Sequence, residues 1–389
     1  MVTMASGFQT LDTLLELVCV ELQLSETQDF LARSHYRAVT DWLACDGSPL
    51  EMLDPHIFPQ GSQRLGTTTR PLRHSEYDLD AVCKLTVVGD WSPGELYQLI
   101  WNRLFESGVY RPMMKRMPRC IRLEYAGSFH LDIAPAIQDR RCGGNCILVP
   151  DLDANLSLDH PENNRWKSTN PQDYADWFEG QCVPVWTLNA KYARAQVDPV
   201  PEQESVHAKP ALKRSVQLLK RWRDVAYADR PTLAPPSIIL TTLGGILYEG
   251  QQLCTDSVQS ILAATVEQIE SGVPLRLTNP AHTAENICEK WDVNPKAYDD
   301  FTESITALRD RWERLATLRG IPAIERELSE LFGESPVRSA VRNMTNRTVV
   351  HPRSNGRLHV QPRSGMLIPA SVAGAQLRIP STTFHGDAK

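Results

Sequence analysis

Apolar and polar side chains alternate in two stretches of the first third of the chain, and this pattern predicts two β-strands. The first alternation is Leu79, Ala81, Cys83 and Leu85; the second is Ile121, Leu123 and Tyr125, and it resumes after a Gly127-Ser128 break as Phe129, Leu131 and Ile133. Because successive side chains of a strand point to opposite faces, each stretch has one face suited to a hydrophobic core. The pattern therefore predicts a sheet with a buried face.

Helical spacing of apolar residues dominates the N-terminus and the part of the chain after the Pro-rich link Asp198–Pro201. Leu11, Leu14, Leu15, Val18 and Leu22 form one helical stripe. Ser25 with Gln28 is typical of a capping box and predicts a second helix, which should bury Leu31, Ala38, Val39 and Trp42. Further stripes are Leu212, Val216 and Leu219, and Ile305, Leu308, Trp312 and Leu315. The fold class predicted is α+β, a mixed sheet with flanking helices followed by a helical lobe.

Three of the polar positions on the predicted strands are carboxylates. Asp78 and Asp80 project from the same face of the first strand, and Asp132 projects away from the core on the second. Neighbouring carboxylates raise each other's pKa unless a cation neutralises them. Mg²⁺ prefers hard oxygen ligands, and three carboxylates can hold two ions about 3.5–4 Å apart. The pattern predicts a two-metal site.

A Gly61-Ser62 turn precedes these carboxylates in the sequence. Its backbone N–H groups and hydroxyl can hold phosphate groups. Taken alone, the Asp78-Leu79-Asp80 segment also suits a solvated strand face, and Asp132 alone suits a helix cap or the surface. The combination of the turn, the paired carboxylates and the third carboxylate favours nucleotidyl transfer.

These segments resemble the polymerase-β-like nucleotidyltransferase superfamily. More narrowly, they resemble the bacterial CD-NTases, relatives of cyclic GMP-AMP synthase and oligoadenylate synthase that make cyclic oligonucleotide signals in anti-phage defence. The further segments that carry the narrower resemblance are Leu218–Trp222, Pro235–Leu240, Thr278-Asn279-Pro280 with Glu285-Asn286, and Asn170-Pro171 with Trp177-Phe178. The resemblance covers roughly residues 55 to 295, which is most of the chain.

The resemblance implies a bilobal enzyme with assigned roles for individual residues. Asp78, Asp80 and Asp132 would hold two Mg²⁺ ions, with Mn²⁺ as the alternative ion, and the donor triphosphate would be held by Gly61, Ser62, Lys220 and Ser237. From the residues alone, Lys220 equally suits a surface lysine whose stem packs on the helix. Ser237, after two prolines, equally suits a helix N-cap.

The expected organisation has four parts. Residues 1–45 form N-terminal helices that brace both lobes, 46–197 the catalytic core, 198–345 the C-terminal helical lobe, and 346–389 a flexible Pro/Gly/Ser-rich tail. The tail composition is typical of poorly ordered segments. The tail is either passive or, as the resemblance suggests, a site for an operon-encoded regulator.

Composition restricts the partners. The 41 basic and 47 acidic residues give a net charge of −6, which disfavours activation by long nucleic acid. The two basic clusters, Arg111/Lys115/Arg116/Arg119/Arg122 and Lys213/Arg214/Lys220/Arg221/Arg223, are interpreted as solvated helix faces and nucleotide-phosphate contacts. No segment reaches the roughly 18 apolar residues of a membrane span, and the N-terminus lacks signal-peptide features. The sequence predicts a cytoplasmic protein without a membrane partner.

Nine cysteines in such a protein are expected to be reduced thiols. Cys142 and Cys146 have ligand-like spacing, but four-coordinate zinc needs two more ligands and the nearby sequence supplies no recognisable pair. Two free thiols in a loop are therefore expected.

The function predicted is Mg²⁺-dependent synthesis of a cyclic di- or trinucleotide from nucleoside triphosphates, with ATP and GTP as the expected substrates. Two alternatives remain at this stage. One is a template-independent enzyme that makes linear oligonucleotides or adenylylates another acceptor; the other is an inactive nucleotidyltransferase fold used for binding. The sequence leaves the bases, ring size and linkage of the product open.

Overall fold

The computed structural model describes residues 2–72, 77–125, 129–182 and 197–346, together with three short strands within 358–378. The chain divides into two compact units. One contains residues 1–21 and 315–389, and the other contains residues 22–314. All the predicted site residues belong to the second unit.

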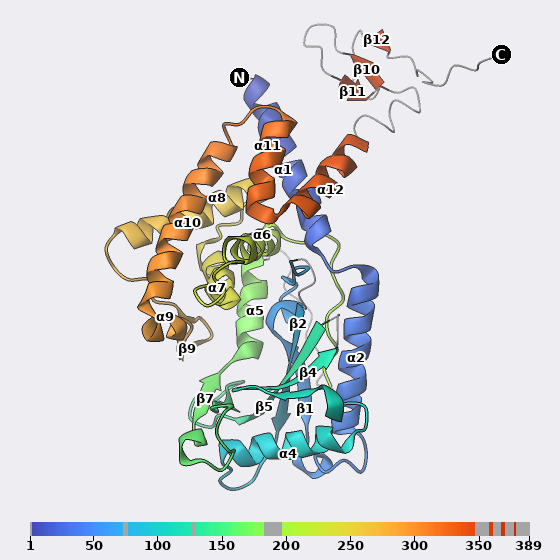
Figure 1. The fold of residues 1–389 in the computed structure, drawn as a ribbon, viewed down its shortest axis with the longest axis vertical. Coiled ribbons are helices and arrows are strands. Elements are labelled where there is room, and N and C mark those ends of the chain that lie inside the picture. The colour runs from blue at the N-terminus through green and yellow to red at the C-terminus, as the bar shows by residue number, and fades with distance from the viewer. Residues whose placement is uncertain are drawn as a thin grey trace, which may run out of the picture. The chain divides into compact units, whose positions relative to one another are not determined.

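The second unit is built on a seven-stranded mixed sheet (Figure 1). Five strands lie side by side in the order β1 (His56–Gln60), β2 (Tyr77–Leu85), β5 (Phe129–Gln138), β4 (Ile121–Tyr125) and β3 (Met114–Arg116). β6 (Ile147–Pro150) pairs with the end of β5 and with β7 (Trp166–Thr169). β2 and β5 are parallel, and the other pairs of this sheet are antiparallel. The first predicted strand is confirmed as β2, whereas the second predicted stretch forms two strands, β4 and β5, which pair antiparallel. The predicted Gly127-Ser128 break lies outside the described residues.

Helices α2 (Glu26–Ala44) and α4 (Pro93–Glu106) pack on one face of this sheet. The buried cluster there includes Leu79, Leu131 and Ile133 from the sheet and Tyr36 and Ile100 from the helices. The alternation therefore predicted the buried face correctly. The carboxylates project from the other face.

The buried side of α2 differs from the prediction. The Ser25/Gln28 capping box is present, but Leu31 is 41% exposed and Ala38 is also exposed. The core residues are Ala32, Tyr36, Val39 and Leu43. Each residue turns an α-helix by about 100°, so a stripe that begins one position later faces a different direction. Val39 is buried as predicted, and Trp42 is partly buried against the same cluster.

Helices dominate the remainder of the second unit. They are α5 (Pro171–Cys182), α6 (Ala211–Ala226), α7 (Ser237–Leu247), α8 (Cys254–Glu270), α9 (Glu289–Val293) and α10 (Pro295–Leu315), with a β8 (Thr278–Asn279)/β9 (His282–Asn286) hairpin. The short helices are α3 (Gly61–Arg64), η1 (Glu51–Leu53), η2 (Arg111–Met113) and η3 (Pro161–Asn163). The α10 stripe is buried as predicted.

Helix α6 is enclosed on nearly all sides. Its predicted stripe of Leu212, Val216 and Leu219 is buried, but so are Lys213, Arg214, Gln217, Lys220 and Arg221. Its neighbours include α5, α7 and α8, and Leu65 at the end of α3 lies in the same buried cluster. The interpretation of this basic cluster as a solvated helix face is therefore wrong. These cations occupy the interior, where each needs a partner.

The first unit contains α1 (Val2–Leu22), α11 (Ile321–Phe332) and α12 (Glu334–Thr345). The predicted α1 stripe is buried. In the region where the sequence predicted an irregular tail, β10 (Leu358–Val360) pairs with β11 (Leu367–Pro369) and β12 (Leu377–Arg378). Among the helices that the structure describes, none is both long and apolar enough to cross a bilayer.

Candidate active site

The parallel pairing of β2 and β5 brings the three predicted carboxylates together. Asp80 lies directly opposite Asp132 in the register, and Asp78 lies opposite His130, whose Nδ1 is 3.3 Å from the Asp78 carboxylate. The Asp78 side chain is about half exposed, whereas that of Asp132 is 13% exposed. The result is an acidic cluster that is open at one end.

A positively charged side chain, that of Arg122, also belongs to this cluster. Arg122 lies opposite Asp132 on β4 and donates to both carboxylate oxygens, at 2.7 Å each. It also donates to Asp78 at 3.3 Å. These hydrogen bonds to Asp132 are the largest cause of a raised Arg122 pKa. Arg122 was predicted to lie on a solvated helix face or at a nucleotide-phosphate contact, but it lies on strand β4. Its contact with Asp132 was not predicted, although its position between Ile121 and Leu123 puts it on the polar face.

Asp80 shows the electrostatic cost of the arrangement. Burial raises the pKa of the Asp80 carboxyl to about 7, with repulsion from Asp132 and Asp78 adding to the effect. Arg122 and Lys220 offset only part of this shift. The predicted repulsion from neighbouring carboxylates therefore contributes to the raised pKa of Asp80. A group of hard oxygen donors with an excess of negative charge suits a divalent cation.

Gly61 lies directly against the Asp80 carboxylate. It has φ +62°, and a β-carbon at this position would be only 2.2 Å from Asp80 Oδ2. Only glycine therefore fits both the backbone conformation and the available space. The predicted Gly-Ser turn is held within van der Waals distance of the carboxylates.

The rest of this turn leads to Lys220. The Ser62 hydroxyl accepts a hydrogen bond from Thr68 Oγ1 at 3.0 Å, and the Ser62 carbonyl accepts from the Thr67 N–H at 2.9 Å. Lys220 Nζ donates to Thr67 Oγ1 at 2.8 Å. The turn therefore lies between Asp80 on one side and the ammonium of Lys220 on the other.

Lys220 is 6% exposed, which excludes the interpretation as a surface lysine. Burial, followed by repulsion from Arg223, lowers the pKa of its ammonium to about 7. Arg223 itself is paired with Asp224, with Nε 2.9 Å from the carboxylate. A buried lysine amine with a lowered pKa gains a proton, and so becomes an ammonium, more readily when an anion arrives beside it.

Ser237 is the first residue of α7, and Pro236 occupies the N-cap position without a side-chain capping bond. The interpretation of Ser237 as an N-cap is therefore wrong. Among the described residues, no hydrogen bond joins the Ser237 hydroxyl to the acidic cluster or to Lys220. Its predicted contact with a triphosphate stays a prediction.

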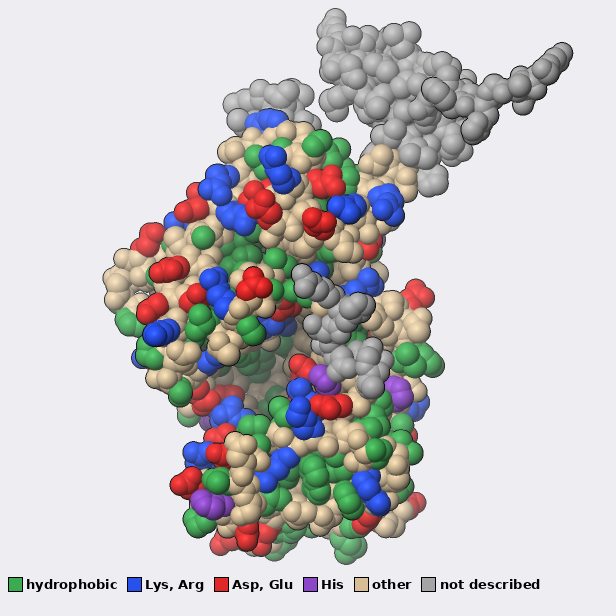
Figure 2. All heavy atoms as spheres, in the orientation of Figure 1, with side chains coloured by type: hydrophobic (Ala, Val, Ile, Leu, Met, Phe, Trp, Pro, Cys, Tyr) green, Lys and Arg blue, Asp and Glu red, His purple; other side chains and the backbone are tan. Residues whose placement is uncertain are grey.

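The β8/β9 hairpin is attached to the sheet through polar contacts. Glu285 accepts hydrogen bonds from Thr169 on β7 at 2.9 Å and from Asn279 at 2.8 Å. The space-filling view is hollowed between the sheet and the helices above it (Figure 2). The hairpin, which carries the Asn279-Pro280 and Glu285-Asn286 segments of the resemblance, is thus attached to the sheet through the Glu285–Thr169 contact.

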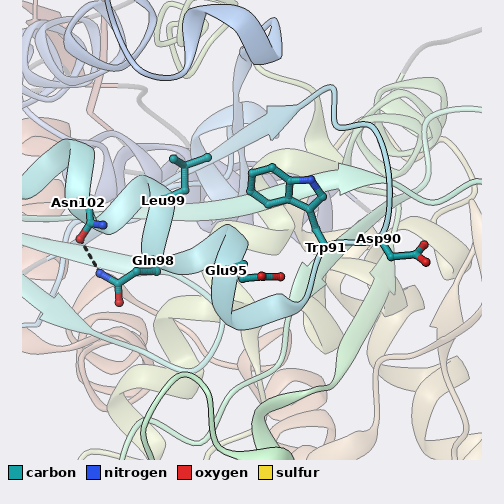
Figure 3. Close-up of a pocket in the computed structure, with 6 residues that line it drawn as sticks. All are labelled: Asp90, Trp91, Glu95, Gln98, Leu99 and Asn102. Carbon is teal, nitrogen blue, oxygen red and sulfur yellow. Dashed lines mark hydrogen bonds between the residues drawn. The ribbon is translucent and has the colours of Figure 1, made fainter.

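A separate open pocket lies along α4 (Figure 3). Its lining residues are Asp90, Trp91, Glu95, Gln98, Leu99 and Asn102. Glu95 caps its own helix through Ser92, and Gln98 donates to Asn102. None of the predicted site residues lines this pocket, and Glu95, Gln98 and Asn102 are engaged in these hydrogen bonds.

The parallel strand pair with its three carboxylates, the adjoining Gly-Ser turn and the buried lysine match the arrangement that the resemblance to polymerase-β-like nucleotidyltransferases predicts. The model of the Second Messenger Oligonucleotide or Dinucleotide Synthetase domain matches residues 9–181. A c-di-GMP synthase of Roseivirga ehrenbergii is 29% identical and aligns over 100% of both chains. The cyclic dinucleotide synthase CdnG of Bradyrhizobium diazoefficiens is 26% identical over 93% of this chain and 90% of its own.

The fold agrees with these sequence matches. The structure of the Bradyrhizobium diazoefficiens CD-NTase CdnG in complex with GTP has a TM-score of 0.68 at 23% identity, covering 86% of this chain and 99% of that one. Together these matches support a CD-NTase family member, and the named relatives are cyclic dinucleotide synthases, which are nucleotidyltransferases.

Proposed function

We propose that this enzyme joins two nucleoside triphosphates into a cyclic dinucleotide and releases pyrophosphate, with Mg²⁺ bound by Asp78, Asp80 and Asp132. The observation that supports this most directly is the contact between the Gly61 turn and Asp80, since it puts phosphate-binding groups beside metal-binding groups. Burial and, after it, repulsion from Asp132 and Asp78 raise the pKa of Asp80, and two divalent cations would neutralise the negative charge of these carboxylates.

The bound ions supply charge neutralisation for the attacking hydroxyl and the leaving pyrophosphate. Gly61, Ser62, Lys220 and Ser237 hold the donor triphosphate, and the lowered pKa of Lys220 allows it to take up a proton as the phosphates bind. Asp132 lies nearest the acceptor hydroxyl. A second attack by the remaining hydroxyl closes the ring. Such transfer depends on positioning and charge, which these residues supply.

We infer that GTP is a substrate, because one relative is named as a c-di-GMP synthase and the CdnG structure contains GTP. ATP is the alternative for either position. The same names favour a dinucleotide over a trinucleotide. As in the family, the product would act as a signal in anti-phage defence, and an operon-encoded regulator would act on residues 346–389, which lie mostly outside the described residues.

Incubation with all four nucleoside triphosphates and Mg²⁺, followed by mass spectrometry before and after phosphatase treatment, tests the proposal. We expect a phosphatase-resistant cyclic product that contains guanine. A product with a removable terminal phosphate would instead identify a linear oligonucleotide synthase, and the absence of pyrophosphate release would identify a binding protein.

The matched variants are Asp78→Asn/Asp80→Asn and Asp90→Asn. The double substitution removes two proposed metal ligands at one end of β2, whereas Asp90 is an exposed carboxylate beyond the other end. The double variant should make no product and Asp90→Asn should match the wild type. Pyrophosphate release at the wild-type rate by the double variant would disprove the metal assignment.

A further inference from the structure

Cys142, Cys146 and His282 form a second cluster of metal-binding side chains. Their ligand atoms lie within 4.8 Å of one another, although 136 residues separate Cys146 from His282. The cysteines occupy the turn between β5 and β6, and His282 begins β9. The cluster therefore joins the sheet to the β8/β9 hairpin.

The turn brings both sulfur atoms to one point. Gly143 and Gly144 have φ of +73° and +56°, a backbone conformation that glycine adopts without strain. The Cys146 N–H donates to the Gly143 carbonyl, and Gln138 Nε2 donates to the carbonyls of Gly144 and Cys146. The turn is thus fixed by its own hydrogen bonds.

Hydrogen bonding determines which nitrogen of His282 faces the sulfur atoms. Ser168 Oγ donates to Asp139 Oδ2 at 2.6 Å, so its lone pair can accept from His282 Nε2, 3.0 Å away. A neutral His282 ring then carries its proton on Nε2. Its Nδ1 lone pair faces Cys142 Sγ at 3.3 Å and Cys146 Sγ at 3.9 Å. A histidine oriented in this way by a second residue is typical of metal ligands.

The two cysteines form a disulfide in this structure, which corrects the expectation of two free thiols. The disulfide sulfur atoms are poor metal ligands, but reduction by a dithiol adds two electrons and two protons, breaks the S–S bond and restores two thiols. A metal ion then displaces the two protons.

We infer that the reduced Cys142, Cys146 and His282 bind one Zn²⁺ ion, which ties the β8/β9 hairpin to the catalytic sheet. Two thiolates and one imidazole are the donor set that zinc takes, and water completes the fourth position beside the exposed Cys142. Oxidation by hydrogen peroxide would remove two electrons from the two thiolates, re-form the disulfide and release Zn²⁺. The peroxide would take up these two electrons and two protons and become two water molecules.

The test uses Co²⁺ as a spectroscopic probe on the reduced full chain, because the thiolate-to-cobalt absorption reports sulfur ligands and not the Asp78/Asp80/Asp132 site. We expect one thiolate-bound Co²⁺ per chain, displaced by an equivalent of Zn²⁺. The absorption should persist in Asp78→Asn/Asp80→Asn and in Cys45→Ser, an exposed free cysteine. It should vanish in Cys142→Ser.

Ser168→Ala should weaken Zn²⁺ binding by about 10- to 100-fold, the usual effect of removing a residue that orients a ligand. Peroxide should abolish the absorption in the unmodified chain and a dithiol should restore it, a comparison that requires no substitution. Absence of thiolate absorption in the reduced wild type, or its persistence in Cys142→Ser, would overturn the inference. Neither outcome would affect the proposed nucleotidyl transfer.

Discussion

The role of Arg122 can be tested by Arg122→Gln, which removes the positive charge but keeps a polar side chain of similar length. In the metal-free protein this substitution leaves Asp132 without two hydrogen bonds of 2.7 Å and Asp78 without one of 3.3 Å. The pair is mostly buried, with 19% and 13% of the two side chains exposed. We expect destabilisation by about 3 kcal/mol, between the value of one charged hydrogen bond and that of a fully buried ion pair.

At an unfolding entropy of about 2.1 cal/mol/K per residue, a loss of about 3 kcal/mol lowers the melting temperature of the second unit, residues 22–314, by roughly 5 °C in EDTA. Saturating Mg²⁺ should recover most of this loss, because the ions supply the charge that Arg122 provides in their absence. The control is Lys115→Gln. Lys115 lies opposite Arg122 on β3 but pairs only with the exposed Glu124, so its loss should cost less than about 1 kcal/mol with or without Mg²⁺.

An equal loss of stability for Arg122→Gln in EDTA and in Mg²⁺ would refute this reasoning. It would mean that Arg122 stabilises the sheet independently of the ions. A loss no greater than that of Lys115→Gln would show that the paired hydrogen bonds contribute no more than a surface ion pair.

Three further predictions concern the turn, the lysine and pH. Gly61→Ala should lower turnover by at least about 100-fold, because the added methyl group displaces Asp80. The control is Gly89→Ala, since Gly89 is also at positive φ but has open space around it. This control should cost only about 1–2 kcal/mol of stability and leave turnover unchanged. Lys220→Ala should lower kcat/KM for the donor triphosphate about 10- to 150-fold, with partial recovery in Lys220→Arg; unchanged steady-state kinetics would remove Lys220 from the site. The raised pKa of Asp80 stabilises the metal-free protein at low pH, so the melting temperature of the protein in EDTA should fall as pH rises from about 4 through about 7. Over the same pH range the affinity for Mn²⁺, measured by calorimetry, should rise. Asp80→Asn should flatten both trends.

The positions of the three carboxylates were predictable from the sequence because a period of two fixes both the face and the strand. The residues that contact these carboxylates and the other site residues were not predictable from the sequence. Arg122 meets Asp132 only through strand pairing, and His282 reaches Cys142 across 140 residues. No local spacing encodes either contact.

Helix α6 shows a different limit of pattern analysis. Its apolar stripe is real, but the opposite side is also buried, so its charged residues have specific partners. Lys213, for example, binds both Glu179 and Glu204. An amphipathic pattern identifies one buried face and does not establish that the other meets water. The buried stripe of α2 was predicted incorrectly for a related reason, because two neighbouring stripes of this helix both contain apolar residues.

The sheet register has a consequence for how this enzyme can vary. Gln60, Asp80, Asp132, Arg122 and Lys115 form one continuous row across five strands. A slip of one residue in β5 would turn Asp132 into the core and Ile133 outward, so the separation of the carboxylates is inherited from the backbone ladder. Changes in nucleotide choice must therefore arise elsewhere. Since the β8/β9 hairpin lies outside that ladder and is held to β7 by side chains, it can diverge while the catalytic spacing stays constant.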